Sequence, residues 1–265
     1  MSEYAEERVQ RIECGTDLVR RQIDYFRRSF AAVESQKKKD SSLVTEADHL
    51  ISNEVLGGLG EKFPGDDLCS EESEAGNQPL EAHFCWVIDP VDGTNNFAIG
   101  LPNCAISLAL LEDGHPIYGW VYDFAGDRLI HGGSGRGLFD GDQPIQPRTV
   151  ESGDSTPIGL QFPVPPGVIQ KLIPLLERER VRSIGSGTME GVYVALGCLQ
   201  GAVDFRVKVW DVAAFFAFFD ELKVPYRFLA RSPFPLRSFD PDMETTPYVA
   251  GVPVFCQKVE SLLGI

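Results

Sequence analysis

Apolar and small residues recur at alternating steps of three and four along the first part of the chain. They stand at Ala5, Val9, Ile12, Thr16, Val19, Ile23, Phe26, Phe30 and Val33. This spacing predicts one long amphipathic helix, with Gly15 as the point where it would break. We expect its apolar face to pack on the body of the protein, with a subunit interface as the alternative. The run Lys37-Lys38-Lys39 is expected to end the helix, because cations complement a helix C-terminus.

A second helix is predicted a few residues further on. Leu43-Val44 is typical of a short extended piece, and Thr45 followed by Asp48 approximates a capping box. The helix then carries its apolar positions at Leu50, Ile51, Val55, Leu56 and Leu59. Asp48 on this interpretation is a helix-start residue.

Short apolar runs separated by turns follow. Phe84 to Ile88 predicts a buried strand that ends at Asp89. Three further runs, punctuated by Gly- and Asp-containing turns, predict an antiparallel meander: Ile106 to Leu111, Ile117 to Tyr122 and Arg128 to His131. The Pro- and Gly-containing stretch 140–154 is the best boundary, which divides the chain into an N-terminal half, 1–147, and a C-terminal half, 148–265.

The C-terminal half continues with mixed periodicities. The expected elements are a helix over Val168 to Leu176, a strand near Val181 to Ile184, a helix opened by Gly185-Ser186-Gly187-Thr188 and running through Leu199, an alternating strand over Ala202 to Trp210, and a helix over Val212 to Leu222 that Asp211 starts. Periodicity alone therefore supports a mixed α/β protein.

Composition narrows the classes of partner. The chain has 265 residues, 43% of them hydrophobic and 24% charged, with a formal net charge of −15. This charge argues against binding of nucleic acid or of anionic membranes. Six cysteines without a CxxC pair are expected to be reduced thiols, and the N-terminus lacks the apolar core of a signal peptide. We therefore expect a cytoplasmic protein.

The most informative segment is Ile88-Asp89-Pro90-Val91-Asp92-Gly93-Thr94-Asn95-Asn96-Phe97. Two carboxylates this close repel each other unless a hard cation lies between them, and oxygen ligands suit Mg²⁺. Gly93 would let the backbone approach an anion, and Thr94 could open a helix whose N–H groups point at a phosphate. An ordinary turn uses the same residue types, so this segment alone leaves both interpretations open.

Three other segments change that balance. In chain order, Leu43-Val44-Thr45-Glu46-Ala47-Asp48, Glu71-Glu72, the segment around Asp89 and Trp210-Asp211 resemble the signature of the inositol monophosphatase family of metal-dependent, lithium-sensitive phosphatases. The resemblance implies a layered α-β-α-β-α sandwich, the fold of inositol monophosphatase and fructose-1,6-bisphosphatase. The chain departs from the family at Glu221-Leu222-Lys223-Val224, where relatives usually have a Glu-Ala-Gly-Gly turn.

The resemblance also implies a set of metal ligands. Glu71, Asp89 and the Val91 carbonyl would hold one Mg²⁺, while Asp89, Asp92 and Asp211 would hold a second. Asp92 would also contact the substrate. Two such ions can bridge a phosphate, lower the pKa of a bound water and stabilise the departing alkoxide.

Roles in catalysis follow from the same resemblance. Thr94 and Asp48 would orient the attacking water, and Glu71 would take part in catalysis as well as in metal binding. Glu72 would contact the metal ligands without binding the two ions itself, or it would bind a weaker third ion. The N–H groups of Gly93 and Thr94 would hold the phosphate.

Substrate choice depends on two further segments. Gly187 and Thr188 lie at a glycine-bearing helix start that could meet the leaving group. Alternation places Asp204, Arg206 and Lys208 on one strand face, where the basic pair could accept a second phosphate or merely neutralise nearby acids.

We therefore expect Mg²⁺-dependent hydrolysis of a small phosphorylated metabolite, with inositol monophosphate as the leading substrate and two or three ions. The alternatives are fructose-1,6-bisphosphatase, bisphosphate nucleotidase and histidinol phosphatase activity, or a non-catalytic protein that binds metal and a phosphorylated ligand. A homodimer is compatible with the sequence.

Overall fold

A computed structural model describes residues 3–32, 35–37, 43–150 and 155–265. Its helices are α1 (Glu3–Ser29), α2 (Glu46–Lys62), α3 (Thr94–Ile99), α4 (Pro166–Leu176), α5 (Gly187–Ala195), α6 (Val209–Leu222) and α7 (Pro253–Leu263). Three of the predicted helices, those starting near residues 45, 168 and 211, are confirmed to within a few residues.

The strands form two main sheets. The seven-stranded sheet has the order β10-β9-β8-β7-β6-β5-β3 and is antiparallel except for the parallel pair β3 and β5. Its strands are β3 (Asp67–Ser70), β5 (Phe84–Asp92), β6 (Ala105–Glu112), β7 (His115–Asp123), β8 (Arg128–Gly133), β9 (Leu138–Asp140) and β10 (Gln143–Pro144). The predicted buried strand and the meander that follows it are both confirmed.

The second sheet has five strands, in the order β12-β11-β13-β16-β14. They are β11 (Ile158–Leu160), β12 (Val181–Arg182), β13 (Gly201–Asp204), β14 (Tyr226–Phe228) and β16 (Tyr248–Gly251). Two small antiparallel pairs complete the structure: β1 (Ser35–Lys37) with β2 (Leu43–Thr45), and β4 (Gln78–Pro79) with β15 (Ser238–Phe239).

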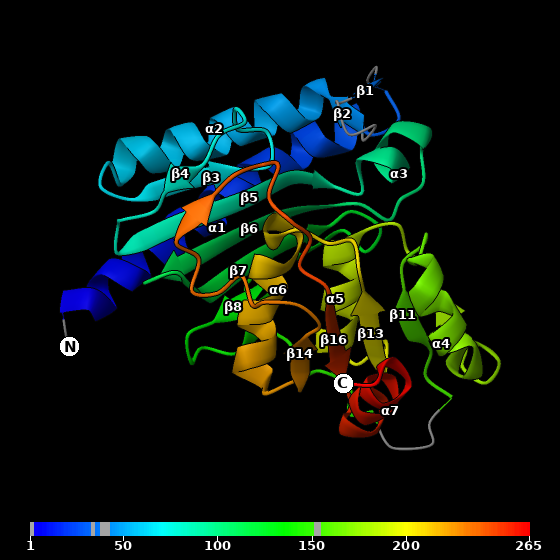
Figure 1. Cartoon of the computed structure of the whole chain (residues 1–265). Coiled ribbons are helices and arrows are strands. Elements are labelled where there is room, and N and C mark those ends of the chain that lie inside the picture. Colours follow the sequence, from blue (N-terminus) through cyan, green and yellow to red (C-terminus); the bar gives the residue numbers. More distant parts are fainter. Residues whose placement is uncertain (1–2, 33–34, 38–42, 151–154) are drawn as a thin grey trace.

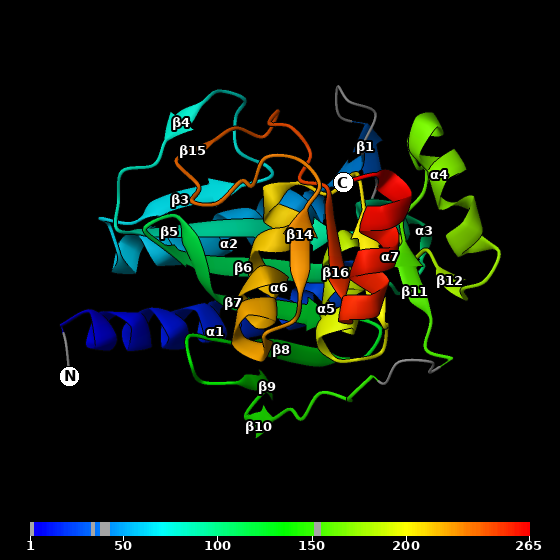
Figure 2. The same cartoon turned by 60° about the horizontal axis from the view of Figure 1, so that its bottom comes forward.

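These elements stack in five layers (Figure 1). Helices α1 and α2 cover one face of the seven-stranded sheet, while α5 and α6 pack between the two sheets. Figure 2 shows α7 and α4 beyond the five-stranded sheet, on the side away from α6. The α-β-α-β-α sandwich expected from the resemblance is therefore confirmed.

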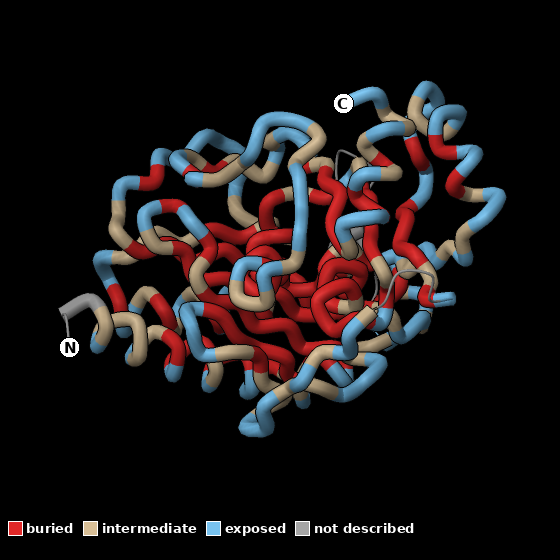
Figure 3. The backbone as a smooth tube through the Cα atoms, turned by 90° about the horizontal axis from the view of Figure 1, so that it is seen from below, coloured by how far each residue is buried: buried red, intermediate tan, exposed pale blue. Residues whose placement is uncertain are grey.

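Both faces of the seven-stranded sheet are buried, which explains its long apolar strands. Along β5, Trp86 and Ile88 face the core beneath α1 and α2, whereas Cys85 and Val87 face the core around α5 and α6. A strand covered on both faces needs apolar residues at every position, not at alternate ones. Figure 3 shows the buried backbone concentrated in the centre of the molecule and the exposed backbone in the outer loops.

Helix α1 is continuous through Gly15, so the predicted break is wrong. A Cβ at Gly15 would lie 2.7 Å from Cζ2 of Trp120, and the glycine therefore permits close packing on the sheet. The helix also ends at Ser29, before the lysine run. Lys37 lies in β1, and Val33, Lys38 and Lys39 lie outside the described residues.

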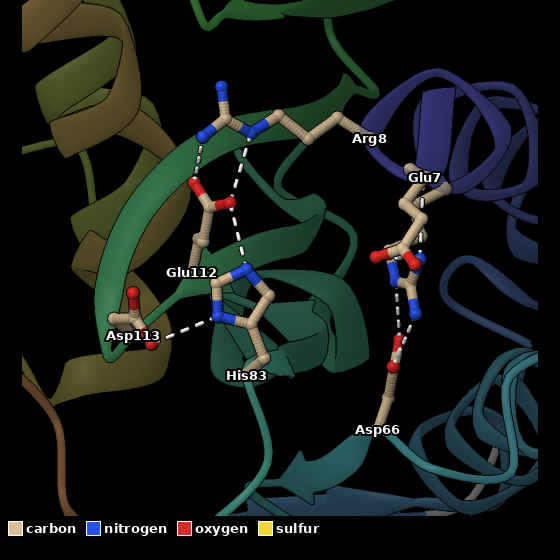
Figure 4. A network of polar contacts seen from close by, with 7 residues as sticks. Glu7, Arg8, Asp66, His83, Glu112 and Asp113 are labelled. Atoms are coloured by element: carbon tan, nitrogen blue, oxygen red, sulfur yellow. Dashed lines mark hydrogen bonds and ion pairs between the residues drawn. The ribbon is translucent and has the colours of Figure 1, made fainter. Parts of the chain in front are cut away.

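Two arginines fix the N-terminal part of α1 to the sheet (Figure 4). Arg11 donates to both carboxylate oxygens of Asp66, at 2.7 and 2.9 Å, and its guanidinium lies 4.0 Å from the ring centre of Phe84. Arg8 donates to Glu112, which also bonds to Nε2 of His83 at 3.1 Å. Together with the buried Val19 and Phe26 side chains, these contacts confirm that α1 packs on the body of the protein.

Three elements of the C-terminal half begin or end at other residues than we predicted. Strand β13 ends at Asp204, not at Trp210, because the Asp204 carboxylate accepts the Arg206 N–H at 2.7 Å and the chain turns there. Helix α6 then starts at Val209, three residues before the predicted first residue, Val212. Helix α5 ends at Ala195, short of the predicted Leu199.

Candidate metal centre

A bulge in β5 brings Asp89 and Asp92 to the same side of the sheet. In the pairing with β6, Asp89 stands opposite Ser107 and Asp92 opposite Ala105, so β5 contains one extra residue between them. Residues three apart on a regular strand point to opposite faces, and the bulge removes that difference. Pro90, which has no N–H to donate to a ladder, suits this interruption.

Asp211 joins the two carboxylates from the first turn of α6. Its Oδ2 accepts the Lys208 N–H at 2.6 Å, and the Thr188 hydroxyl donates to its backbone carbonyl at 2.9 Å. Oxygen atoms of Asp89, Asp92 and Asp211 lie within 4.8 Å of one another. Asp211 is therefore the third residue of its helix and not, as predicted, the residue that precedes it.

The Asp92 carboxylate also accepts hydrogen bonds at the start of α5. The Ser186 hydroxyl donates to Oδ2, and the N–H groups of Gly187 and Thr188 donate at 3.2 and 3.0 Å. Ser186 itself is the N-cap of α5, since its Oγ accepts the Met189 N–H at 3.1 Å. Gly187 and Thr188, which the sequence suggested could meet the leaving group, thus donate their N–H groups to Asp92.

Glu71 and Glu72 follow directly after β3. Ser70 is paired with Ile88, and the Glu71 N–H donates to the Ile88 carbonyl at 3.2 Å, so Glu71 enters the site beside Asp89. The Glu71 carboxylate is not a member of the group of three closest acids in the described chain. The Glu72 N–H donates to Oγ of Ser70 at 3.1 Å.

Burial and mutual repulsion perturb the whole acid group. Burial raises the pKa of Asp89 well above its usual value, and the charges of Glu71, Asp92 and Asp211 raise it further. Burial, followed by the charges of Asp92 and Glu71, likewise raises the pKa of Asp211. Burial raises the pKa of Asp92 to about 6, a smaller shift because its hydrogen bonds from Ser186 and Thr188 favour the ionised form.

Such a group fits a divalent cation. Carboxylates that are buried and close together are unfavourable when ionised, unless a positive charge compensates for them. Their donor atoms are all oxygen, the ligand type of Mg²⁺. The residues present therefore fit Mg²⁺.

Asp48 lies at the start of α2, as predicted. Its Oδ2 accepts the N–H and the hydroxyl of Thr45, at 2.7 and 2.6 Å. Its Oδ1 is buried and has no partner among the residues that the structure describes. Burial raises the pKa of Asp48 to about 7; the Thr45 bonds oppose this shift, and the charges of Glu72 and Glu71 add to it.

The segment after Asp92 is held in place by its own turn and by the side chain of Asn96, a role that we did not predict. Gly93 has φ of +81° and begins α3 at Thr94, whose hydroxyl donates to the Val91 carbonyl at 2.9 Å. The Asn96 amide donates to the carbonyls of Asn103 and Ile184 at 2.8 and 2.9 Å. The role of Ser186 could have been found from the preference of serine for helix N-caps. The bond from Asn96 to Ile184 spans 88 residues, and no sequence pattern signals such a contact.

Arg206 and Lys208 do not share a strand face, so this prediction is wrong. Both follow the end of β13: the Arg206 side chain is exposed, whereas Nζ of Lys208 donates to the Met243 carbonyl. Asp204 is buried at the end of the strand, and its Oδ2 has no partner within the described part of the chain.

Comparison with solved structures identifies the class of fold. A crystal structure of an IMPase/NADP phosphatase complexed with Mg²⁺ and phosphate superimposes with a TM-score of 0.81 over 97% of this chain and 95% of that chain, at 21% sequence identity. At this identity the likeness shows the fold alone, which is that of an inositol monophosphatase.

Sequence comparison gives the family. The profile of the Inositol monophosphatase family matches residues 6–220, so the chain belongs to this family and is an inositol monophosphatase-like phosphoric monoester hydrolase. It is 31% identical to the inositol-1-monophosphatase of Bacillus subtilis over 203 residues, which cover 75% of this chain and 77% of the relative. It is 34% identical to the histidinol-phosphatase of Mycobacterium tuberculosis over 186 residues, 67% of this chain and 70% of the relative. None of the described helices combines the length and the apolar character that a membrane span requires.

Proposed function

We propose that this protein hydrolyses inositol monophosphate, or a closely similar small phosphate monoester, with Mg²⁺ and a metal-activated water. The observation that carries the proposal is the group of three acids formed by the β5 bulge and the first turn of α6, beside Glu71. This group has the donor atoms and the charge that a hard cation requires.

The proposed ligands are those implied by the family resemblance. Glu71, Asp89 and the Val91 carbonyl hold one ion, while Asp89, Asp92 and Asp211 hold another, and Glu72 supports them or binds a weaker third ion. Bound Mg²⁺ lowers the pKa of a water and stabilises negative charge on phosphate oxygens.

The chain's own residues do the rest of the chemistry. Asp48 and Thr94 orient the attacking water, and a carboxylate with a pKa of about 7 is well matched to accept a proton from it. The water oxygen forms the new P–O bond while Asp48 takes one of its protons, and the ester P–O bond breaks. The departing alkoxide takes a proton from solvent water, and Asp48 returns its proton to solvent. N–H groups of Gly93 and Thr94 hold the phosphate.

The substrate is the finer part of the proposal. The family resemblance supports contact of Gly187 and Thr188 with the leaving group; both lie at the start of α5, where their N–H groups donate to Asp92. Exposed Arg206 is available for a second anionic group, which would favour a bisphosphate or nucleotide, whereas Lys208 is engaged with Met243. The relative named histidinol-phosphatase keeps that activity as a further alternative.

The setting of the enzyme is also proposed from the sequence. We expect a cytoplasmic enzyme that acts on small metabolites, without nucleic-acid or membrane partners; a homodimer is compatible with the sequence. The division into halves at residues 147 and 148 belongs to the same set of proposals.

The test is phosphate release from inositol 1-phosphate, fructose 1,6-bisphosphate, adenosine 3′,5′-bisphosphate and histidinol phosphate, with Mg²⁺, with EDTA and with added Li⁺. We expect Mg²⁺-dependent, Li⁺-sensitive turnover of inositol 1-phosphate above the other three. Faster turnover of another substrate would reassign the specificity. No turnover by folded protein that binds Mg²⁺ would favour the non-catalytic alternative.

A further inference from the structure

Gln161 lies one residue beyond the end of β11 and is almost fully buried, with 8% of its surface exposed. Its Oε1 accepts the Gly185 N–H at 3.0 Å and the Ser183 hydroxyl at 3.2 Å, and its Nε2 donates to the Ser186 carbonyl at 3.1 Å. All three bonds go to a single segment, residues 183–186, which leads from β12 into α5.

Asn96 holds the same segment from the other side. Its Nδ2 donates to the Ile184 carbonyl at 2.9 Å, and a Cβ at Gly185 would lie only 2.6 Å from this nitrogen. Gly185 also has φ of +80°, a conformation that favours glycine. Two amide side chains, from α3 and from the end of β11, therefore fix residues 184–186 between them.

This segment in turn fixes a carboxylate of the acid group. Ser186 Oγ donates to Asp92 and accepts the Met189 N–H, so one hydroxyl both caps α5 and contacts the metal centre. The next two N–H groups donate to the same carboxylate. If residues 183–186 moved, the Ser186 hydroxyl and the two N–H groups that donate to Asp92 would therefore move with them.

We propose that Gln161 is a positioning residue, which holds residues 183–186 in place so that Ser186 and the start of α5 orient the Asp92 carboxylate for metal binding. This inference rests on the proposed function in so far as Asp92 is a metal ligand. Partners that orient metal ligands typically contribute about 10- to 100-fold to metal affinity or activity.

The test compares Gln161→Met with Gln200→Met in the full chain. Methionine keeps most of the volume of glutamine and removes its strong hydrogen bonds. Gln200 is a matched control, because its Nε2 donates to the Thr156 carbonyl at 2.9 Å and to Glu179 at 3.1 Å, away from the acid group. Both variants should lose a similar, modest amount of thermal stability in EDTA.

Mg²⁺ titrations followed by melting temperature give the decisive readout. We expect Gln161→Met to need about tenfold more Mg²⁺ for half of the stabilising shift, and Gln200→Met to stay within about twofold of the original protein. An unchanged Mg²⁺ midpoint in Gln161→Met, or an equal shift in both variants, would overturn the proposal.

Two more variants keep the test decisive if Gln161→Met does not fold. Gln161→Glu keeps an acceptor for the Gly185 N–H but replaces the donor to the Ser186 carbonyl with an oxygen, which repels that carbonyl when ionised, so we expect the Mg²⁺ midpoint to rise here too. Ser186→Ala should weaken Mg²⁺ binding by itself, and Gln161→Glu should have a smaller effect in that background than in the original protein, because Gln161 acts partly through the Ser186 hydroxyl and partly through the Gly187 and Thr188 N–H groups. Full additivity of the two changes would contradict this order of action.

The two proposals fail in distinguishable ways. Failure of the original protein to release phosphate from any substrate would remove the proposed function, while the comparison of Mg²⁺ midpoints would still decide the role of Gln161.

Discussion

Helices α2 and α6 begin with the same local interaction but differ in what their aspartates face. In each helix the third residue is an aspartate that accepts the N–H of the N-cap residue: Asp48 from Thr45 at 2.7 Å, and Asp211 from Lys208 at 2.6 Å. Asp211 lies within 4.8 Å of Asp89 and Asp92, whereas Asp48 is outside this group.

This difference shows that an aspartate in the first turn of a helix can accept the N-cap N–H and still have a further role, which depends on what its other oxygen faces. The hydrogen bond to the N-cap N–H occupies one carboxylate oxygen in both helices and leaves the other oxygen to its surroundings. For Asp211 the surroundings are two more carboxylates, so we infer a metal ligand. Asp48 is buried, and burial together with the charges of Glu72 and Glu71 raises its pKa to about 7, so we infer a group that handles the attacking water.

The largest expected effect comes from removing Asp89, one of the two carboxylates that lie close to Asp211 at the start of α6. Asp89→Ala should lower Mg²⁺-dependent phosphate release by at least about 10³-fold, because metal stabilisation of the transition state contributes several kcal/mol. The fold should persist, since the change removes one acid from a repelling group. Circular dichroism and phosphate release would check both statements, with Glu244→Ala, at an exposed acid, as the control. Activity within tenfold of the original would remove the proposed site.

Asp48→Asn should affect turnover without affecting metal binding. The asparagine oxygen can still accept the Thr45 N–H, so α2 should start normally, but the amide cannot accept a proton. We expect kcat to fall about 10²-fold and the Mg²⁺ midpoint to change less than about threefold. Steady-state kinetics at several Mg²⁺ concentrations would measure both quantities. A large rise in the Mg²⁺ midpoint would place Asp48 among the metal ligands.

Asp211→Asn should show the opposite pattern. The asparagine oxygen can again accept the N–H of the N-cap residue, here Lys208, but the metal loses a charged ligand. We expect the Mg²⁺ concentration for half-maximal activity to rise about tenfold or more, and the activity to recover partly at high Mg²⁺. The same titrations used for Asp48→Asn give the comparison directly. If the two variants show the same split between turnover and Mg²⁺ dependence, the contrast between the two helix starts is wrong.

The N-terminal half could be predicted well because its signals are local. Strand β5 and the meander are apolar runs bounded by turns, and the pair Thr45 and Asp48 is a helix-start signal. Even there, the break expected at Gly15 was wrong, because the reason for this glycine is Trp120, more than a hundred residues away. The family resemblance implied which residues are the proposed metal ligands, while the bulge that makes two of them converge is a property of strand pairing.

The contacts around Asp92 could not have been predicted in the same way. Ser186 reaches Asp92 across 94 positions, and Gln161 reaches Ser186 across 25. A buried glutamine carries no periodic or capping signal of its own. The alternation of Asp204, Arg206 and Lys208 was misleading, because the Asp204 carboxylate turns the chain by accepting a backbone N–H that a strand would have used differently.

The start of α5 provides a third case, in which the acid should affect the thermal stability of the protein. The cap of α5 is Ser186, and the acid in its first turn, Glu190, is fully buried with neither carboxylate oxygen bonded to any described residue. Burial raises the pKa of Glu190 well above its usual value, and the charges of Asp204 and Asp92 raise it further. Unlike Asp48 and Asp211, this acid has no N–H to compensate for its charge.

The sign of the resulting pH dependence follows from linkage. Because the pKa is higher in the folded protein than in the unfolded chain, the neutral form favours folding at low pH, and this contribution is lost as the pH rises through the folded value. Glu190→Gln stays neutral, so in EDTA it should melt about 2 to 4 °C above the original protein at pH 8, the shift that 1 kcal/mol produces in a chain of this size. Near pH 4, below the pKa of the unfolded chain, the two proteins should melt together, and Glu61→Gln, at an exposed acid of α2, should match the original at both values. A Glu190→Gln variant that is less stable at pH 8 would mean that the charged carboxylate is compensated in the folded protein, and that α5 begins with a satisfied acid as α2 and α6 do.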